Sequence, residues 1–204
     1  MKKTAKSSNE ATGVIVSDSI ANVSDVAIVD LPNKSCLNRT VQRQRAKNNP
    51  QLTNPVDRVD LVIPHHFSTT QNGEKFLLHD SGGKNRYLLF STQANLRFLS
   101  NCKVWMVDGT FKCVPATFLQ LYTIHGMRNG KVLPLAYILA PNKTARLYTE
   151  VLKKLIELKP DLKPKTMIVD YEKSFINGLK ACFPTTKIRG CHFHYGQCIY
   201  RHVQ

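Results

Sequence analysis

Apolar and polar positions in the C-terminal half of the chain predict short strands separated by amphipathic helices. Short apolar runs that end at a turn signal or a charged residue are typical of buried strands, and apolar side chains three and four residues apart are typical of helices. The expected strands cover 104–108, 118–124, 132–140, 166–170 and 187–191, and the expected helices cover 142 or 144 to 158, 175–182 and a segment from about Tyr195. This order predicts an α/β fold, a mixed sheet flanked by helices, in which the first and fourth of these strands are neighbours.

The N-terminal half has a weaker pattern. Residues 1–35 are rich in Ser, Asn and Asp without a sustained period, which predicts a disordered segment. A basic helix is expected from Cys36 to Asn49, ended by Pro50. Strand-like runs follow at 61–63, 76–78 and 87–90, and Thr92 can cap a short helix that buries Leu96 and Leu99. The expected organisation is therefore 1–35 disordered, 36–100 a basic helix with a small α+β lead-in, and 101–204 the main domain.

Charge narrows the class of partner. The chain has 29 basic and 14 acidic residues, a formal net charge of +15, which favours a polyanion such as DNA, although a ribosome-like or membrane-surface protein has a similar balance. No stretch is long and apolar enough to span a bilayer, so no membrane partner is expected. A solvated helix face and a phosphate-contacting or nuclear-import segment both fit the basic residues of the expected helix, which are Arg39, Arg43, Arg45 and Lys47.

Two aspartates, Asp108 and Asp170, each end a short apolar run, so one carboxylate is expected at the tip of each of two buried strands. Carboxylates brought together repel one another unless protons or a divalent cation neutralise them, and Mg²⁺ or Mn²⁺ prefers such oxygen ligands. Structural roles stay open for both residues: Asp108 begins an Asp-Gly turn, and Asp170 can cap the next helix, with Glu172 complementing the helix dipole. A haloacid dehalogenase signature is excluded, because Met106 occupies the position of its nucleophile.

A cluster of cysteine and histidine forms the third candidate site. Cys191 and His194 have the spacing of a zinc-ligand pair, and Cys198 follows His194 by one helical turn. Ordinary buried or surface roles are equally open for these residues, since a closed zinc site needs four ligands. No secretory signal is visible, so reduced thiols are expected for all six cysteines, which are Cys36, Cys102, Cys113, Cys182, Cys191 and Cys198.

Five short segments together resemble the transposase domain of Mutator-like elements, the MULE family of the DDE transposase superfamily. They are 105–112 (WMVDGTFK), 120–126 (QLYTIHG), 141–144 (PNKT), 170–173 (DYEK) and 189–194 (RGCHFH). The resemblance implies a ribonuclease H-like fold, DNA as the partner, a nuclear location, and Mg²⁺- or Mn²⁺-dependent cleavage and strand transfer. It also implies that Asp108 and Asp170 are the first two catalytic acids, and that Cys191 and His194 form the Cys-x-x-His signature that follows them.

The chain departs from this family in two respects. The family places a third acid, a glutamate, on a helix beyond the Cys-x-x-His signature, whereas no Asp or Glu follows Glu172 here. No paired-cysteine zinc finger precedes the domain. We therefore expect a domain that is incomplete at its C-terminal end, truncated before the third acid.

Three functions fit these observations. The first is a transposase-derived chain that does not cleave DNA alone. The second is a domesticated, non-catalytic DNA-binding protein, and the third is a compact nuclease with an unrecognised ligand. A homo-oligomer is compatible with each of them.

Overall fold

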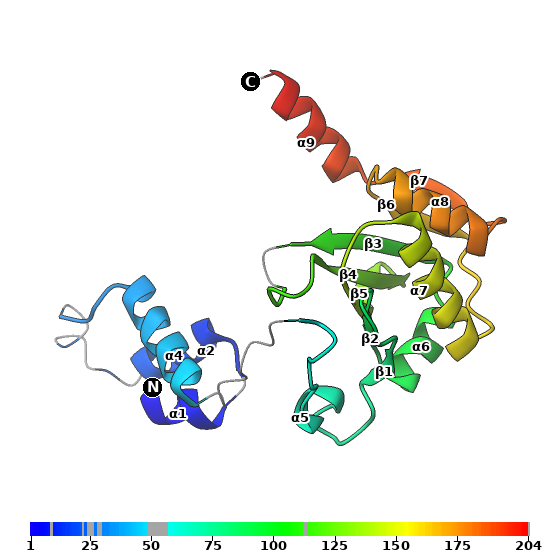
Figure 1. Cartoon of the computed structure of the whole chain (residues 1–204). Helices are drawn as coiled ribbons and strands as arrows, with labels where there is room; N and C mark the ends of the chain where they lie inside the picture. Colours follow the sequence, from blue (N-terminus) through cyan, green and yellow to red (C-terminus); the bar gives the residue numbers. More distant parts are fainter. Residues whose placement is uncertain are drawn as a thin grey trace. The chain divides into compact units, whose positions relative to one another are not determined.

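The computed structural model describes residues 1–8, 10–21, 23, 27, 30–48, 57–111 and 114–203. The chain forms two compact units, Met1–Thr53 and Asn54–Gln204 (Figure 1). Among the described residues, no helix combines the length and the apolar character needed to cross a membrane. The predicted helix end at Pro50 and the cysteine at position 113 lie outside the described residues.

The N-terminal unit is helical, so the prediction of a disordered segment over 1–35 is wrong for the residues described. Helices α1 (Lys2–Ser7), α2 (Thr12–Ala21) and α4 (Lys34–Asn48) pack together. The short Val/Ile patches that show no clear period in the sequence supply this core, because Ile15 and Val16 are fully buried against Leu37 and Val41 of α4. Burial between helices provides the stability that local propensity does not.

The second unit is built on one mixed sheet with the strand order β1-β2-β5-β4-β3-β6-β7. Its strands are β1 (Leu77–Asp80), β2 (Leu88–Phe90), β3 (Val104–Thr110), β4 (Gln120–Arg128), β5 (Lys131–Ala140), β6 (Thr166–Val169) and β7 (Lys187–Gly190). Pairing is antiparallel from β1 to β3 and parallel from β3 through β6 to β7. The predicted mixed α/β architecture and the pairing of the first and fourth expected strands, now β3 and β6, are confirmed.

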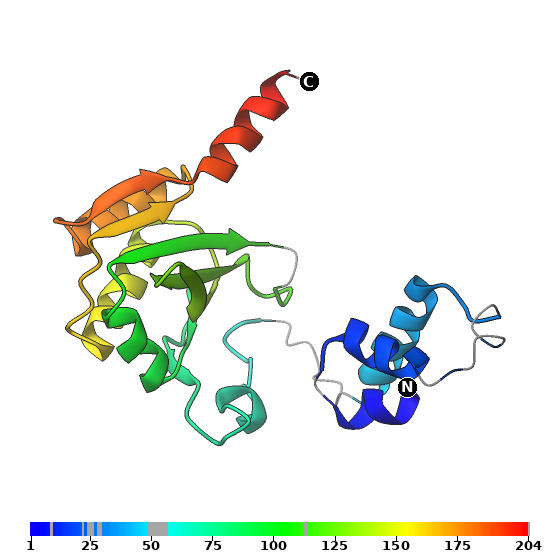
Figure 2. The same ribbon diagram turned by 180° about the vertical axis from the view of Figure 1, so that it is seen from behind.

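Three helices bury one face of this sheet. Helices α6 (Gln93–Ser100), α7 (Ala145–Leu158) and α8 (Lys173–Cys182) share one apolar core with the strands, and α7 and α8 pack against each other. In the reverse view the strands β3, β6 and β7 are seen with α7 and α8 behind them (Figure 2). The largest side chains that are fully buried in this core are Trp105, Leu89, Leu96, Leu99, Ile124, Ile138, Leu152, Leu155, Met167 and Phe175.

Local sequence signals set several element ends. The β4–β5 hairpin turns through Asn129 and Gly130, whose φ values of 51° and 73° are the left-handed conformations that a two-residue hairpin turn needs. The Thr92 and Thr144 hydroxyls accept the backbone N–H of Asn95 and Leu147, so each caps a helix as predicted. Helix α9 (His192–Val203) begins at His192, which is earlier than the start predicted near Tyr195.

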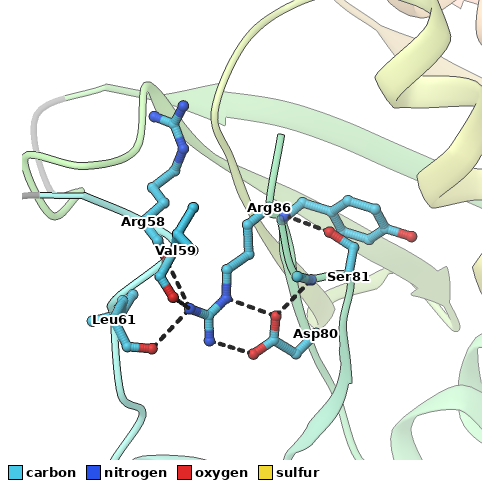
Figure 3. A network of polar contacts seen from close by, with 8 residues as sticks. Arg58, Val59, Leu61, Asp80, Ser81 and Arg86 are labelled. Atoms are coloured by element: carbon cyan, nitrogen blue, oxygen red, sulfur yellow. Dashed lines mark hydrogen bonds and ion pairs between the residues drawn. The ribbon is translucent and has the colours of Figure 1, made fainter. Parts of the chain in front are cut away.

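The predicted strand at 61–63 is absent, and a buried arginine explains the difference. Arg86 is 8% exposed, and its guanidinium donates to the carbonyl oxygens of Arg58 (2.6 Å) and Leu61 (2.8 Å) while pairing with both carboxylate oxygens of Asp80 (Figure 3). These carbonyl groups find their partner in a side chain rather than in a neighbouring strand. Residues 57–64 therefore form a loop, followed by the short helix α5 (His65–Ser68).

Candidate carboxylate site at the ends of β3 and β6

The two candidate aspartates stand at the same level of neighbouring strands. Asp108 lies in β3, and Asp170 directly follows β6. The parallel register pairs Trp105 with Met167 and Met106 with Ile168. Asp108 and Asp170 each come two residues after the last of these pairs, so the period of two puts both on the strand face of Met106 and Ile168.

This is the face turned away from the helix core. Trp105, Val107 and Val169 are buried within the core, whereas the Asp108 side chain is 54% exposed and Asp170 is half-buried. Two oxygen donors are therefore available to solvent at adjacent strand ends. Two carboxylates in this arrangement suit a hard divalent cation that keeps some water ligands and takes others from a phosphate.

The turn after β6 differs from the capping role considered for Asp170. The N-cap residue of α8 is Glu172, and Asp170 instead accepts the backbone N–H of Glu172 at 3.3 Å through Oδ1. The Glu172 carboxylate makes no capping bond. Hydrogen bonding of the Asp170 carboxylate within its own turn restrains the direction in which it points.

Glu172 is tied to a polar network on the core side of the sheet. The Tyr148 hydroxyl donates to Glu172 Oε1 at 2.6 Å and accepts from Gln120 Nε2 at 2.5 Å. Gln120 is fully buried, and Lys143 Nζ lies 3.7 Å from Glu172 Oε2. Burial and the bond to Glu172 both raise the pKa of Tyr148. The network joins β4, α7 and the turn that carries Asp170.

Gly109 and Tyr122 fit closely beneath this network. A side chain at position 109 would approach Gln120 Oε1 and the Tyr122 ring to 3.2 Å, which explains the glycine after Asp108. Burial raises the pKa of Tyr122, and neither its hydroxyl nor Gln120 Oε1 has a hydrogen-bond partner among the described residues. Asp108 is therefore followed by a tightly packed glycine, which lies against the buried polar groups of Gln120 and Tyr122.

His194 is the residue of the Cys-x-x-His pair that reaches the carboxylates. It lies in the first turn of α9, where its Nε2 is 3.8 Å from Asp108 Oδ1. The Cys191 backbone N–H donates to the carbonyl of Val169 at 2.8 Å, which ties the start of α9 to the end of β6. The described residues contain no group of three or more His, Cys, Asp or Glu side chains arranged to hold a metal ion. A zinc role for Cys191 and His194 stays a prediction.

The family comparison bears directly on this geometry. Residues 104–197 match the model of the MULE transposase domain. The matching segment runs from the start of β3 into α9 and includes Asp108, Asp170, Cys191 and His194. No curated protein matches the chain.

Outside the MULE-matching segment, the basic residues of α4 differ in their surroundings. Arg39, Arg43 and Lys47 are exposed. Arg45 is half-buried and donates to the carbonyl oxygens of Ser8 (2.8 Å) and Glu10 (2.6 Å), so it links α4 to the connection between α1 and α2. Arg45 therefore contributes to the fold of its unit, and a DNA contact by any of these four residues stays a prediction.

Sequence reasoning did not single out Gln120, Lys143 and Tyr148 within the MULE-matching segment. One signal was available for two of them. Gln120 occupies an inward position of a strand, and Tyr148 occupies the apolar face of a helix. A polar group at such a position needs a buried hydrogen-bond partner. The pairing itself depends on the packing of α7 against the sheet, which no local pattern specifies.

Proposed function

We propose that this chain derives from a Mutator-like DNA transposase with a ribonuclease H-like domain, and that Asp108 and Asp170 hold a divalent cation against a DNA phosphodiester. The observation that carries the proposal is the position of these two carboxylates at one level of adjacent parallel strands, inside the segment that matches the MULE transposase domain. The order of three antiparallel strands followed by helix, strand, helix and strand supports the ribonuclease H-like assignment.

The donor set fits Mg²⁺ or Mn²⁺ better than zinc. Both aspartates offer carboxylate oxygens on a solvent-accessible face, whereas a structural zinc site needs four nitrogen or sulfur ligands. A bound Mg²⁺ or Mn²⁺ would polarise a phosphodiester oxygen and neutralise negative charge on it.

The other residues position these two carboxylates and attract the substrate. The Gln120–Tyr148–Glu172 network holds the turn that carries Asp170, and His194 lies against Asp108. Arg189 pairs in register with Ile168 and so shares the strand face of the aspartates. Its exposed guanidinium supplies a cation where a phosphate would approach.

We further propose that this chain binds DNA without cleaving it alone. Its sequence contains no acidic residue after Glu172. The Glu172 carboxylate already accepts a hydrogen bond from Tyr148 and pairs with Lys143. The two aspartates are then the carboxylates that the site supplies. Among the described residues, no third His, Cys, Asp or Glu side chain joins the two aspartates in a group arranged to hold a metal ion.

Two measurements test this proposal. Calorimetric titration with Mn²⁺ should show binding to the wild type that Asp108→Asn and Asp170→Asn each abolish. Asp161→Asn, which removes an exposed carboxylate after α7, is the matched control and should bind like the wild type. Unchanged Mn²⁺ binding in both site variants would refute the cation site. Mn²⁺-dependent nicking of plasmid DNA that is lost in Asp108→Ala and Asp170→Ala would refute the absence of cleavage.

A second function, a domesticated DNA-binding protein without a metal site, is favoured by the charge of the C-terminal segment. Residues 173–204 contain five basic and no acidic residues. In this alternative Asp108→Asn and Asp170→Asn leave DNA affinity in Mg²⁺ unchanged or raise it, because they remove negative charge. A loss of Mg²⁺-dependent affinity in these variants would exclude it.

A further inference from the structure

Exposed aromatic rings follow Asp170 and His194 directly in the sequence. Tyr171 follows Asp170 directly and is 54% exposed, and Tyr195 follows His194 and is 53% exposed. The centroids of these two rings are 6.5 Å apart. Phe111, close in sequence to Asp108, is also exposed and lies 4.0 Å from Lys143 Nζ. Large rings left in solvent beside a candidate site indicate a binding surface rather than core packing.

The backbone beneath Tyr171 is adapted to its ring. A Cβ atom at Gly190 would lie 2.6 Å from the Tyr171 hydroxyl oxygen and 2.7 Å from Cζ, so the ring rests where a side chain at position 190 would stand. The absence of a side chain at the end of β7 allows this close approach. Tyr171 is thus supported on one side while more than half of its surface stays accessible.

The charge around these rings selects a polyanion. Asp170 and Glu172 flank Tyr171 in the sequence, but Lys173, Lys187 and Arg189 are exposed on the neighbouring elements and no acidic residue follows Glu172. This positive charge would not strengthen the binding of an apolar protein segment. A nucleic acid uses both features, since cations hold its phosphates and an aromatic ring stacks on a base.

We propose that Tyr171, supported by Gly190 and flanked by Tyr195, is a stacking surface for an unpaired base of the DNA that this unit binds. The inference rests on the proposed function and specifies its substrate as DNA with a single-stranded or unpaired nucleotide at the site. In a duplex the faces of the bases are covered by their neighbours, so a base can stack on a protein ring only after it leaves the helix.

The test measures DNA binding in EDTA, so that it does not depend on the metal site. The probes are a short single strand that contains 2-aminopurine and a closed hairpin duplex of the same sequence. Wild-type protein should bind the single strand more tightly and quench the 2-aminopurine fluorescence. Tyr171→Ala should weaken single-strand binding about tenfold, the size expected for one lost base stack, and should leave duplex binding unchanged.

Matched variants separate stacking from other effects. Tyr171→Phe keeps the aromatic face and should bind like the wild type, whereas Tyr171→Leu, which keeps apolar bulk, should lose affinity as Tyr171→Ala does. Phe67→Ala removes another exposed ring, on α5, and should change nothing. Tyr171→Leu also carries the test if Tyr171→Ala lowers the helix content measured by circular dichroism.

Three outcomes would overturn the inference. One is equal wild-type affinity for the single strand and the duplex. Another is full single-strand affinity in Tyr171→Leu. The third is a Tyr171→Ala variant that dissociates an oligomer and keeps its single-strand affinity, which would assign the surface to protein docking. A failure of Mn²⁺ binding with preserved single-strand stacking would instead count against the cation site alone.

Discussion

The candidate site includes the residues that support the turn of Asp170 as well as the two aspartates. The buried Gln120 amide donates to the Tyr148 hydroxyl, which in turn donates to Glu172. Through the backbone N–H of Glu172 this anchor reaches Asp170 Oδ1. Groups that hold a metal ligand in place commonly affect metal affinity tenfold or more when removed, so we expect these side chains to affect Mn²⁺ affinity at the proposed cation site.

Tyr148→Phe tests this anchor. The variant leaves the buried Gln120 amide and the Glu172 carboxylate without their shared partner, so we expect the free energy of unfolding to fall by about 1–3 kcal/mol. Mn²⁺ affinity should also fall, because the turn that carries Asp170 loses its support. Urea unfolding and calorimetry measure the two effects. Glu150→Gln, which removes an exposed ion pair with Arg146 on the same helix, should change neither.

Asp80 gives a pH-dependent contribution to stability. Its hydrogen bond from Arg86 holds the pKa of Asp80 below its ordinary value of 3.8. A group whose pKa is lower in the folded state stabilises the protein above the unfolded pKa, and this stability is lost as the pH falls through the folded pKa. Between pH 5 and pH 2.5, wild-type stability should therefore decline more steeply than that of Asp80→Asn. Parallel urea-unfolding curves across this range would contradict the role of the Arg86 pair.

At the scale of elements, the sequence predicted those helices and strands whose ends are set by the local sequence pattern. The alternating strand β6 and the helices with threonine caps were found close to their predicted ends, because one buried face or one cap bond fixes each of them, whereas β4 runs four residues beyond its predicted end. The start of α9 was predicted too late, since His192 and Phe193 are exposed and leave no apolar period to read. The missing strand at 61–63 depends on Arg86, a partner more than twenty residues away.

Alanine substitutions at two glycines test how closely α7 and α8 pack: Gly178 lies at their contact, and Gly196 is the control. A Cβ at Gly178 of α8 would lie 3.1 Å from the Thr149 backbone nitrogen and 3.1 Å from Tyr148 Cβ, whereas one at Gly196 of α9 meets nothing within 4 Å. Replacing glycine by alanine in a helix adds about 1 kcal/mol of helix stability. We expect Gly196→Ala to show this gain in urea unfolding. Gly178→Ala should show a net loss of about 1–2 kcal/mol instead, because the opposing backbone cannot easily move. Equal gains in both variants would contradict close packing.

For the whole molecule, the sequence predicted the mixed sheet, its β3–β6 pairing and the basic helix α4, but not α1 and α2 or their packing against that helix. The sheet follows from a few apolar runs and from topological rules that leave few arrangements. The core of the N-terminal unit depends on isolated residues, such as Ala5 and Val41, that meet only after the helices have packed. At the candidate site, the two aspartates were readable because each ends an apolar run. Their support by Tyr148 and His194 arises from tertiary packing.

The basic face of α4 provides the last prediction, because charge is distributed over both units. Each DNA phosphate neutralised by the protein adds about 0.9 to the slope of log affinity against log salt. If Arg39, Arg43 and Lys47 contact phosphates, neutralising all three to Gln should lower that slope by two to three units, roughly one per lost contact. Arg45→Gln should instead lower the stability of the N-terminal unit, since Arg45 is bonded to the Ser8 and Glu10 carbonyls. Filter binding over 50–300 mM salt measures the slopes. An unchanged slope in the triple variant would assign this face to solvent and leave DNA binding to the second unit.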